Sequence, residues 1–330
     1  KDSIREINLA IATTTCFKEE FIRSNISMIR KEIMESGDPI AEHLFVNVVD
    51  NGRTLKPEEI ESKHIRLISN KNTGGSGGFA RGMLEALHMK EKITHVLLMD
   101  DDVCILPESI KRAYRLMKYV KKEYETALLS GAMMELDNME IFHEDIGVVR
   151  ANKDFFHLKR ICNVRYLDNI LRNNRKTPYH QHEYAGWWFC CIPVSVIRKN
   201  GLPLPLFLRG DDVEYGIRCG EYIMTISGIS VWHMGFASKF SFSTNFYQEF
   251  RNMMIVRSAS GKIQDVDVYS HWLDECYRAG LAYNYNAWEL LLLAMEEYLK
   301  GPSFIEEDHC EEILKRNKAL DEKLSPLSEL

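Results

Sequence analysis

ITHVLLMDDD, residues 93–102, is the stretch that decides the fold of this chain. Its apolar run predicts a buried strand, since short continuous apolar runs are typical of strands covered on both faces. In a parallel α/β sheet the carboxyl end of such a strand opens onto the ligand crevice. Asp100, Asp101 and Asp102 stand at that end, and carboxylates so close repel one another unless a cation or strong donors compensate them. Alone, the triplet is either a solvated acidic turn or the oxygen-rich site of a hard divalent ion.

The sequence around this stretch alternates strand and helix patterns. Strands separated by helices of ten to fifteen residues imply a parallel sheet with right-handed crossovers. We therefore expect an α/β fold, Rossmann-like, with a mostly parallel central sheet flanked by helices. Residues 136–184 are polar and irregular, whereas the pattern from residue 256 onward predicts a C-terminal helical appendage. The expected strands are residues 7–13, 43–50, 65–70, 93–100, 126–134 and 223–233, and the expected helices are residues 19–35, 79–90, 194–199 and one that begins at Pro107.

Composition narrows the class of protein. The chain has 330 residues, of which 45% are hydrophobic, enough for one large domain or a domain with an appendage. A net charge of −6 argues against general nucleic-acid binding, and no apolar run is long enough to span a membrane. The eight cysteines form no Cys-x-x-Cys pair, so we expect reduced thiols in a cytosolic protein rather than a thiolate zinc site. The start lacks both Met and an apolar leader, so we expect a catalytic piece of a longer polypeptide that is fused to further domains.

One segment is strongly basic. From Arg150 to Lys176 there are eight basic residues against two acids, +6 in a chain of net −6. Such a segment is either a solvated helical face or a patch for anionic lipid headgroups or a phosphate-bearing acceptor, since each basic residue near an anionic membrane contributes about 1 kcal/mol.

Five further groups have side chains suited to chemistry. The glycine-rich turn from Asn72 to Gly78 lets the backbone approach a bulky ligand, with Arg81 nearby to bind a phosphate or a sugar hydroxyl. Asp50 ends a strand and can accept a hydrogen bond from a base or ribose, although Asp-Asn-Gly is also an ordinary turn. The other three groups lie later in the chain.

Asp211-Asp212 at a helix start is either a helix cap or a carboxylate placed to take a proton from a hydroxyl. His233 ends an apolar strand, where it is either structural or a metal ligand beside carboxylates. Trp187 and Trp188 belong to an aromatic run whose side chains pack in the core or stack on apolar sugar faces.

Together these blocks resemble family 2 glycosyltransferases of the GT-A fold, and within them the UDP-galactofuranose-dependent galactofuranosyltransferases of bacterial cell-surface galactan. The resemblance runs in family order over about three quarters of the chain. The blocks that carry it are Asn72-x-Gly-Gly-Ser-Gly-Gly-Phe79-x-Arg81, Leu98-Met99-Asp100-Asp101-Asp102, Trp187-Trp188-Phe189-Cys190-Cys191-Ile192-Pro193, Leu202-Pro203-Leu204-Pro205, Asp211-Asp212-x-x-Tyr215-Gly216 and Trp232-His233-Met234.

The resemblance implies a role for each matching residue. Asp100, Asp102 and His233 would hold Mn²⁺ or Mg²⁺, Asp212 would be the general base, and Asp211 would orient the acceptor or the base. Asp101 would serve backbone geometry or the ribose. The implied nucleotide and donor contacts are Thr15, Phe17, Lys18, Asp50, Asn72, Gly75 and Arg81, and the implied acceptor-side residues are Trp187, Trp188 and Tyr247.

The resemblance also implies the reaction and its setting. We expect an inverting, metal-dependent transfer of galactofuranose from a UDP-linked donor to a glycan or lipid-linked acceptor, at the inner face of the cytoplasmic membrane. The expected parts are a GT-A domain over residues 1–255, divided at residue 134 into nucleotide and acceptor halves, and a helical region over residues 256–330. The chain departs from the family in having no β-barrel ahead of residue 7 and a shorter helical end, so processive polymerisation is not implied.

Three other functions remain open. A rhamnosyltransferase with a deoxythymidine diphosphate donor would share the fold. A sugar-1-phosphate nucleotidylyltransferase would need a glycine loop directly after the first strand, and residues 12–18 contain no glycine. A catalytically silent carbohydrate-binding relic would have no reason to retain Asp100, Asp102, Asp212 and His233 together.

Overall fold

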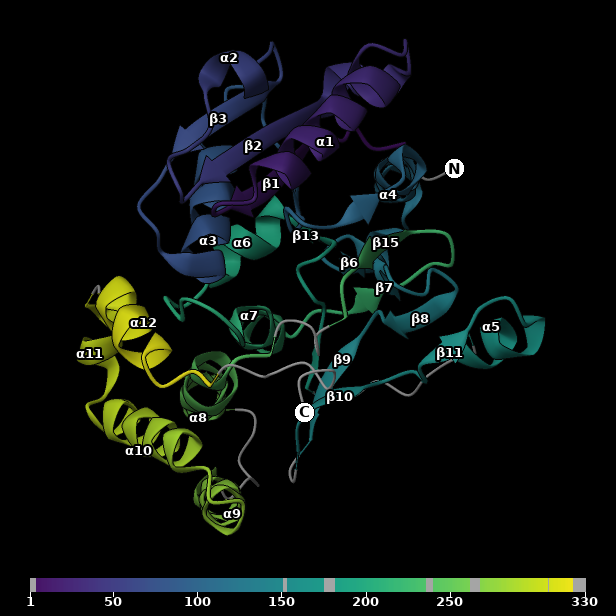
Figure 1. Cartoon of the computed structure of the whole chain (residues 1–330). Helices are drawn as coiled ribbons and strands as arrows, with labels where there is room; N and C mark the ends of the chain where they lie inside the picture. Colours follow the sequence, from purple (N-terminus) through teal and green to yellow (C-terminus); the bar gives the residue numbers. More distant parts are fainter. Residues whose placement is uncertain are drawn as a thin grey trace.

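The computed structural model describes residues 4–150, 153–174, 182–235, 240–261, 268–307 and 309–322. It contains a large sheet at the amino-terminal end, two smaller sheets beside it and a group of helices that ends the chain (Figure 1). The strands are β1 (Leu9–Thr15), β2 (Leu44–Asp50), β3 (Ile65–Ser69), β4 (His95–Leu98), β5 (Cys104–Ile105), β6 (Leu128–Ser130), β7 (Ala132–Glu135), β8 (Ile141–Glu144), β9 (Gly147–Arg150), β10 (Lys153–His157), β11 (Cys162–Asn163), β12 (Glu183–Tyr184), β13 (Cys190–Pro193), β14 (Ile223–Met224) and β15 (Ser230–His233).

The helices alternate with the strands early in the chain and follow one another at its end. The α-helices are α1 (Glu19–Ile29), α2 (Pro57–Ile60), α3 (Gly74–Leu87), α4 (Pro107–Tyr119), α5 (Leu167–Asn173), α6 (Val194–Asn200), α7 (Asp211–Cys219), α8 (Phe250–Ser260), α9 (Val268–Leu281), α10 (Tyr285–Leu299), α11 (Pro302–Glu306) and α12 (Cys310–Lys318). Two π-helical turns, Arg30–Met34 and Ser243–Glu249, continue α1 and precede α8.

The central sheet has the order β14-β6-β13-β4-β1-β2-β3. Four of its neighbouring pairs are parallel, and β13 runs antiparallel to both β4 and β6. Helices cover both faces of this sheet. Successive residues of a strand point to opposite faces, so each strand contributes to two cores. Leu9 and Ile11 of β1 pack in the cluster that contains α1 and α4, whereas Ala10 and Ala12 pack against α3 and α6. The expected α/β class and mostly parallel sheet are confirmed.

Two predicted strands are each divided. The apolar run 126–134 forms β6 and β7, and the run 223–233 forms β14 and β15; in both cases the second strand leaves the central sheet for a five-stranded one, β11-β8-β7-β15-β5. Glycines make these breaks possible: a side chain at Gly131 would overlap Phe189, and Gly228 has a φ of +90°. The polar middle of the chain forms the remaining strands, including the three-stranded sheet β10-β9-β12.

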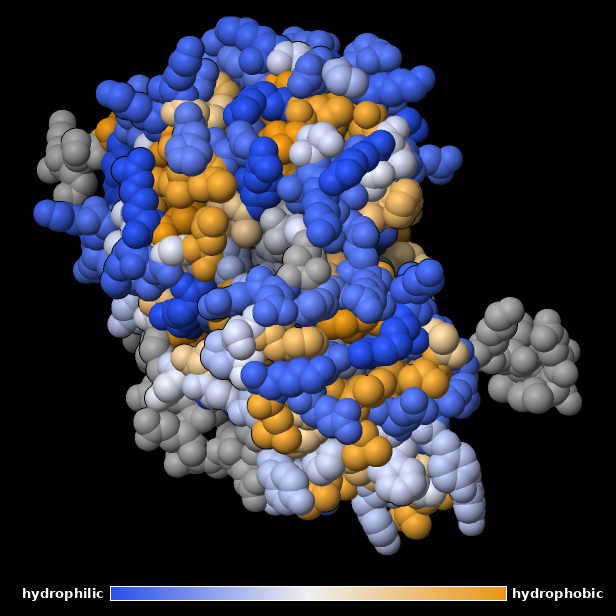
Figure 2. All heavy atoms as spheres, turned by 90° about the vertical axis from the view of Figure 1, so that its left-hand side faces the viewer, coloured by the Kyte–Doolittle hydropathy of each residue, from blue (hydrophilic) through white to orange (hydrophobic). Residues whose placement is uncertain are grey.

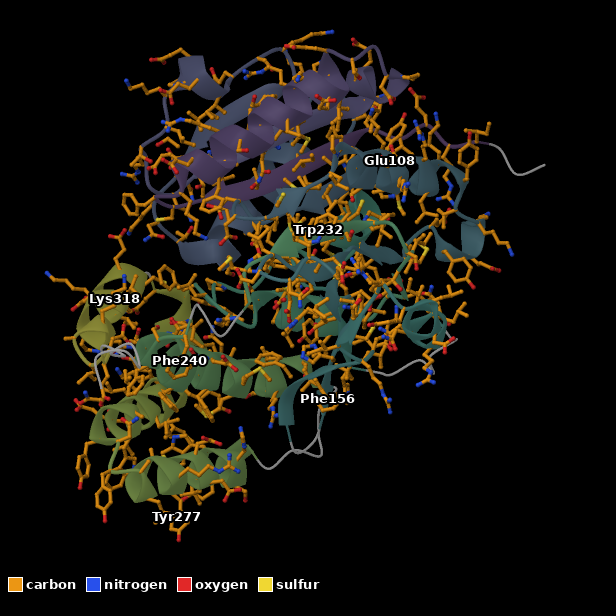
Figure 3. All side chains as sticks on the ribbon, turned by 45° about the vertical axis from the view of Figure 1, so that its right-hand side comes forward. Glu108, Phe156, Trp232, Phe240, Tyr277 and Lys318 are labelled. Carbon is orange, nitrogen blue, oxygen red and sulfur yellow. The ribbon has the colours of Figure 1, made fainter. Side chains whose placement is uncertain are left out.

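The C-terminal helices form their own core around Leu290, Leu291 and Ala294 of α10. The predicted domain boundary at residue 255 falls inside α8, whose residues pack both with α7 and with α10. Figure 2 shows apolar side chains interspersed among polar ones on this part of the surface, where Leu273, Leu281, Leu292 and Leu299 are exposed. In Figure 3, Tyr277 of α9 points away from the rest of the molecule.

Candidate active site

The aspartate triplet follows β4 in a tight turn held by a buried amide. The Asn25 side chain donates to the carbonyl oxygens of Asp101 and Val103, both at 3.0 Å. This anchors the backbone so that Asp101 and Asp102 are buried, whereas 35% of the Asp100 side chain is exposed. The triplet is therefore a fixed turn at the end of the central sheet rather than a solvated acidic loop.

His233 joins the triplet from another sheet. It ends β15, and its Nε2 atom lies 3.4 Å from Oδ1 of Asp102 and 3.8 Å from Oδ2 of Asp100. Its Nδ1 lies 2.7 Å from the carbonyl oxygen of Met234, which fixes Nδ1 as the donor and directs the Nε2 lone pair toward the carboxylates. Ligand atoms of the three side chains all lie within 4.8 Å of one another. Two carboxylates and an imidazole are a donor set that suits Mn²⁺ or Mg²⁺.

Lys18 connects this cluster to the first strand. Its Nζ lies 2.8 Å from Oδ2 of Asp102 and 3.3 Å from Oδ1 of Asp101. Burial raises the pKa of Asp101 to about 6, and the Lys18 charge opposes that rise. A bound cation and Lys18 would share the Asp102 carboxylate, so Lys18 is placed to neutralise charge at the edge of the candidate metal cluster.

Asp211 and Asp212 open α7, and both line a cavity of about 570 Å³. Gly210 precedes them with a φ of +78°, the left-handed conformation that turns the chain into the helix. Burial raises the pKa of Asp211 to about 7, and the pKa of Asp212 rises well above its usual value through burial and the neighbouring Asp211 charge. Carboxyl groups with such raised pKa values are suited to take and give protons near neutrality.

The same cavity is lined by Gly75, Trp187, Trp188, Asp100 and His233, so the structure brings the candidate metal cluster, the aspartate pair and the aromatic pair together. A methyl group at Gly75 would lie 3.6 Å from Oδ2 of Asp211. Gly75 is therefore the residue of the glycine-rich turn that faces the aspartate pair. The ring of Trp187 packs edge-on against Phe79, and Trp188 donates from Nε1 to the Gly131 carbonyl oxygen at 2.9 Å. The two indoles thus sit in different core clusters while both reach the cavity.

The predicted nucleotide residues of the first two strands lie outside this cavity. Thr15 is buried at the end of β1, and Phe17 is 70% exposed with a φ of +58°. The Asp50 carboxylate accepts four backbone hydrogen bonds, from the N–H groups of residues 52–55, at 2.8–3.0 Å. These fill the lone-pair positions of a carboxylate. We therefore correct the predicted ligand contact of Asp50: its carboxylate organises the loop that follows β2.

The glycine-rich turn also differs from its prediction, because it forms the first turn of α3 rather than a loop ahead of the helix. Asn72 accepts from the N–H of Gly74 at 3.2 Å, a local cap. Arg81 pairs with Glu85 on its own helix at 2.9 Å and does not line the cavity. The direct donor contact predicted for Arg81 is therefore not supported by its position.

Tyr247 was expected on the acceptor side, and the structure contradicts this. Its side chain is 1% exposed, its hydroxyl donates to the Glu297 carboxylate, and Arg251 donates to it at 3.0 Å. Arg316 of α12 also donates to Glu297. Tyr247 thus ties the π-helical turn before α8 to the C-terminal helices, and Asn245 and Glu249 of that turn line the cavity instead.

Several residues that line the cavity were not predicted from the sequence. Glu144 of β8, His157 of β10, Tyr184 of β12 and Arg209 all line it. No motif marked the first three, because they come from the polar middle whose strands carry no clear alternation. Arg209 precedes the aspartate pair directly, and that adjacency was the one available signal.

The basic segment is partly engaged within the molecule. Lys159 pairs with the buried Asp145, and Arg165 pairs with Glu140. Residues 151, 152, 175 and 176 and the side chains of Arg150 and Lys153 lie outside the described residues. Binding of an anionic surface by this segment stays a prediction. Lys159 and Arg165 are already paired with acids of the same chain, so they contribute less to it. Among the helices that the structure describes, none has a stretch long and apolar enough to cross a bilayer.

Known proteins resemble this chain in sequence. The model of glycosyltransferase-like family 2 matches residues 40–254. Galactofuranosyltransferase GlfT2 of Mycolicibacterium smegmatis is 32% identical over 248 residues, which cover 70% of this chain and 37% of that protein. The Mycobacterium tuberculosis protein of the same name is 29% identical over 250 residues, with 71% and 38% covered. The chain thus spans a little over a third of the length of these curated relatives.

Solved structures also match. The mannosyltransferase PcManGT from Pyrobaculum calidifontis, in complex with GDP-Man and Mn²⁺, aligns with a TM-score of 0.47 at 12% identity, covering 96% of this chain and 81% of that one. S. aureus TarS 1-349 in complex with UDP aligns with a TM-score of 0.48 at 11% identity, covering 81% and 69%.

Proposed function

The chain belongs to glycosyltransferase-like family 2, and from this membership we propose that it transfers galactofuranose from UDP-galactofuranose to a hydroxyl of a growing cell-surface glycan. One observation carries the proposal: a candidate metal cluster and a pair of half-buried carboxylates line the same cavity. Such a cavity can hold a nucleoside diphosphate at one end and a reacting hydroxyl at the other. The choice of sugar is supported by the galactofuranosyltransferases that the chain resembles.

In this proposal Asp100, Asp102 and His233 hold Mn²⁺ or Mg²⁺. A divalent ion bound there would neutralise the charge of the leaving diphosphate. Lys18 lies beside the cluster with a positive charge of its own, and we assign it to the nucleotide-facing side. Phe17, exposed in the left-handed conformation next to the loop of residues 52–55, offers a ring face for stacking on the base.

The carboxylates of α7 do the proton chemistry. Asp212 acts as general base and removes the proton of the acceptor hydroxyl, which attacks the anomeric carbon from the face opposite the diphosphate and inverts it. The Asp211 charge raises the pKa of Asp212, and the Asp100 charge raises the pKa of both. We therefore assign Asp211 to orienting the acceptor or the base, with Trp187 and Trp188 forming the apolar surface for the sugar.

A donor panel tests the proposal. The protein is incubated with Mn²⁺ and, in turn, UDP-galactofuranose, UDP-galactopyranose, UDP-glucose, GDP-mannose and dTDP-rhamnose, without acceptor, and release of nucleoside diphosphate and binding are measured. Selective binding or slow hydrolysis of UDP-galactofuranose is expected. Preference for dTDP-rhamnose would replace the sugar assignment by that of a rhamnosyltransferase, and indifference to every nucleotide sugar would refute the proposal.

A further inference from the structure

Three side chains away from the aspartate triplet form a second cluster of potential metal ligands. His143 and Glu144 belong to β8 and His157 to β10, and their ligand atoms lie within 4.8 Å of one another. Glu144 and His157 line the cavity next to the aspartate pair. Figure 1 shows β9 and β10 below β8 and to the right of α7, and Figure 3 labels Phe156, the neighbour of His157, on this strand.

Irregular strand pairing makes this cluster possible. His143 and Glu144 are sequence neighbours, and on a regular strand their side chains would point to opposite faces. The pairing of β7 with β8 shifts between Met133↔Glu144 and Met134↔Phe142, which leaves His143 as the extra, bulged residue. A second shift interrupts the pairing of β10 with β9 ahead of His157. Bulges re-aim side chains and occur beside active sites, and here two of them direct three ligands to one point.

The contacts within the cluster use one oxygen of Glu144 and leave the other without a donor in the described part of the chain. Nδ1 of His157 lies 2.5 Å from Oε2 of Glu144, and the His143 and His157 rings meet edge-on with centroids 4.8 Å apart. Glu144 is 6% exposed, and its Oε1 is buried and accepts no hydrogen bond within the described part of the chain. A buried carboxylate oxygen without a donor is destabilising, and a bond to a metal ion would compensate that loss.

A neighbouring carboxylate can orient one of the imidazoles. Oε1 of Glu135 lies 3.5 Å from Nδ1 of His143. In metal sites a histidine commonly donates its second ring N–H to a carboxylate, and this fixes the other nitrogen as ligand. Glu135 is placed to play that part for His143.

The charge of the cavity also favours a second cation. Five acids line it (Asp100, Glu144, Asp211, Asp212 and Glu249), and Arg209 is the one Arg or Lys among its described lining residues. A cation bound by Asp100 and Asp102 would compensate negative charge only at the end of the cavity nearest the aspartate triplet. Glu144 lies near enough to Asp212 to raise its pKa, so a cation on Glu144 would offset charge beside the aspartate pair.

We propose that His143, Glu144 and His157 bind a second divalent cation, of the zinc class, on the wall of the cavity next to Asp212. Two imidazoles and one carboxylate suit Zn²⁺ or Co²⁺ better than Mg²⁺. Three protein ligands leave an open coordination position, as in sites where zinc binds a substrate or water oxygen. The two clusters are thus expected to differ in metal preference, the triplet being oxygen-rich and this one imidazole-rich.

Cobalt serves as a visible probe of both sites. Chelator-treated full chain is titrated with Co²⁺ while heat and visible absorption are recorded. Two equivalents are expected, and His143→Gln/His157→Gln should bind one, without the visible band of imidazole-bound, low-coordinate Co²⁺. Asp100→Asn/Asp102→Asn should also bind one equivalent and keep that band. Unchanged stoichiometry in the histidine variant, or loss of all binding in the aspartate variant, would overturn the proposal.

Zinc-edge X-ray absorption keeps the test independent of the histidine variant's folding. Asp100→Asn/Asp102→Asn with one equivalent of Zn²⁺ should show two imidazoles per zinc at about 2.0–2.1 Å, and a single imidazole or none would overturn the assignment. Glu135→Gln should weaken binding of this equivalent by about 10–100-fold, and unchanged affinity would remove Glu135 from the site. These readouts do not depend on glycosyl transfer.

Discussion

Nε2 of His233 lies 3.4 Å from Oδ1 of Asp102, although the two residues come from different sheets. Asp102 follows β4 of the central sheet, and His233 ends β15 of the five-stranded sheet. The short strand β5, which begins two residues after Asp102, pairs with β15 and holds the two chain segments together. The candidate metal cluster therefore depends on the junction of the two sheets. A stable junction holds its residues in place before a cation binds.

Replacing either partner should weaken metal binding. Loss of a second-sphere residue alone costs about 10–100-fold in affinity, so we expect His233→Gln and Asp102→Asn each to reduce Mn²⁺ affinity by at least about 100-fold. Binding is measured by Mn²⁺ paramagnetic resonance. Asp137→Asn, at an exposed acid outside the cavity, is the matched control and should bind as the unaltered chain does. Wild-type affinity in both site variants would exclude this cluster as the Mn²⁺ site.

The aspartate pair should make transfer depend on pH near neutrality. A base must be ionised to act, and burial raises the pKa of Asp212 well above its usual value and that of its neighbour Asp211 to about 7. Because a carboxyl group is protonated below its pKa, the transfer rate should rise with pH over a range above that of an ordinary aspartate. Asp212→Asn should lower the rate by about 10²–10⁴ while donor binding stays intact. Donor binding that falls as steeply as in Asp100→Ala would argue that Asp212 is not the base.

Two adjacent glycines should respond in opposite ways to the same substitution. Gly74 has a φ of +68°, and a Cβ there would lie 2.1 Å from the Phe207 carbonyl oxygen. Strain of this kind costs about 1–3 kcal/mol before the overlap is relieved, so Gly74→Ala should lower the free energy of unfolding by at least about 2 kcal/mol. Urea unfolding measures this loss.

Gly75→Ala is the matched variant. Its Cβ would make an ordinary contact, 3.6 Å from Asp211 Oδ2, and alanine favours a helix by about 1 kcal/mol over glycine. Stability should stay equal or rise, while transfer should fall by about tenfold because the methyl group enters the cavity beside Asp211. Equal losses of stability in both variants would contradict the view that only Gly75 serves the cavity.

The sequence predicted the elements whose signal is local. The strands β1 to β4 and the helix α4 follow from apolar runs and from Pro107. Of the aspartates predicted at the strand ends, Asp100 lines the cavity and Asp50 does not. The division of residues 126–134 into two strands could not be predicted from the sequence, because it depends on Phe189, far along the chain, packing against Gly131. An apolar run has the same sequence pattern whether its residues belong to one sheet or to two.

The parts of the site that were missed or misplaced depend on long-range partners. Tyr247 lies in a helical segment where it can face either way, and Glu297, far along the chain, draws it into the C-terminal core. Asp50 ends its strand as expected, but the following loop folds back onto its carboxylate. His143 and Glu144 share a face only because of a bulge in β8, and the letters of the sequence do not mark bulges.

His95, inside the stretch that decides the fold, should make the protein sensitive to acid. It is 5% exposed in β4, and burial, with a smaller contribution from Arg5, lowers its pKa from 6.5 to about 4. The folded state therefore favours the neutral ring. Below pH 6.5 the unfolded chain takes up a proton that the folded chain resists, so stability is complete above that pH and falls as pH drops toward 4.

The expected loss between pH 7 and pH 4 is about 3 kcal/mol from this group, at about 1.4 kcal/mol for each pKa unit. Urea unfolding at pH 7, 5.5 and 4 measures it. His95→Leu should be less pH-dependent than the unaltered chain by that amount, whereas His88→Leu, at an exposed position after α3, should retain the full dependence. Parallel pH curves for the unaltered chain and His95→Leu would show that another group controls acid unfolding, since a leucine cannot titrate.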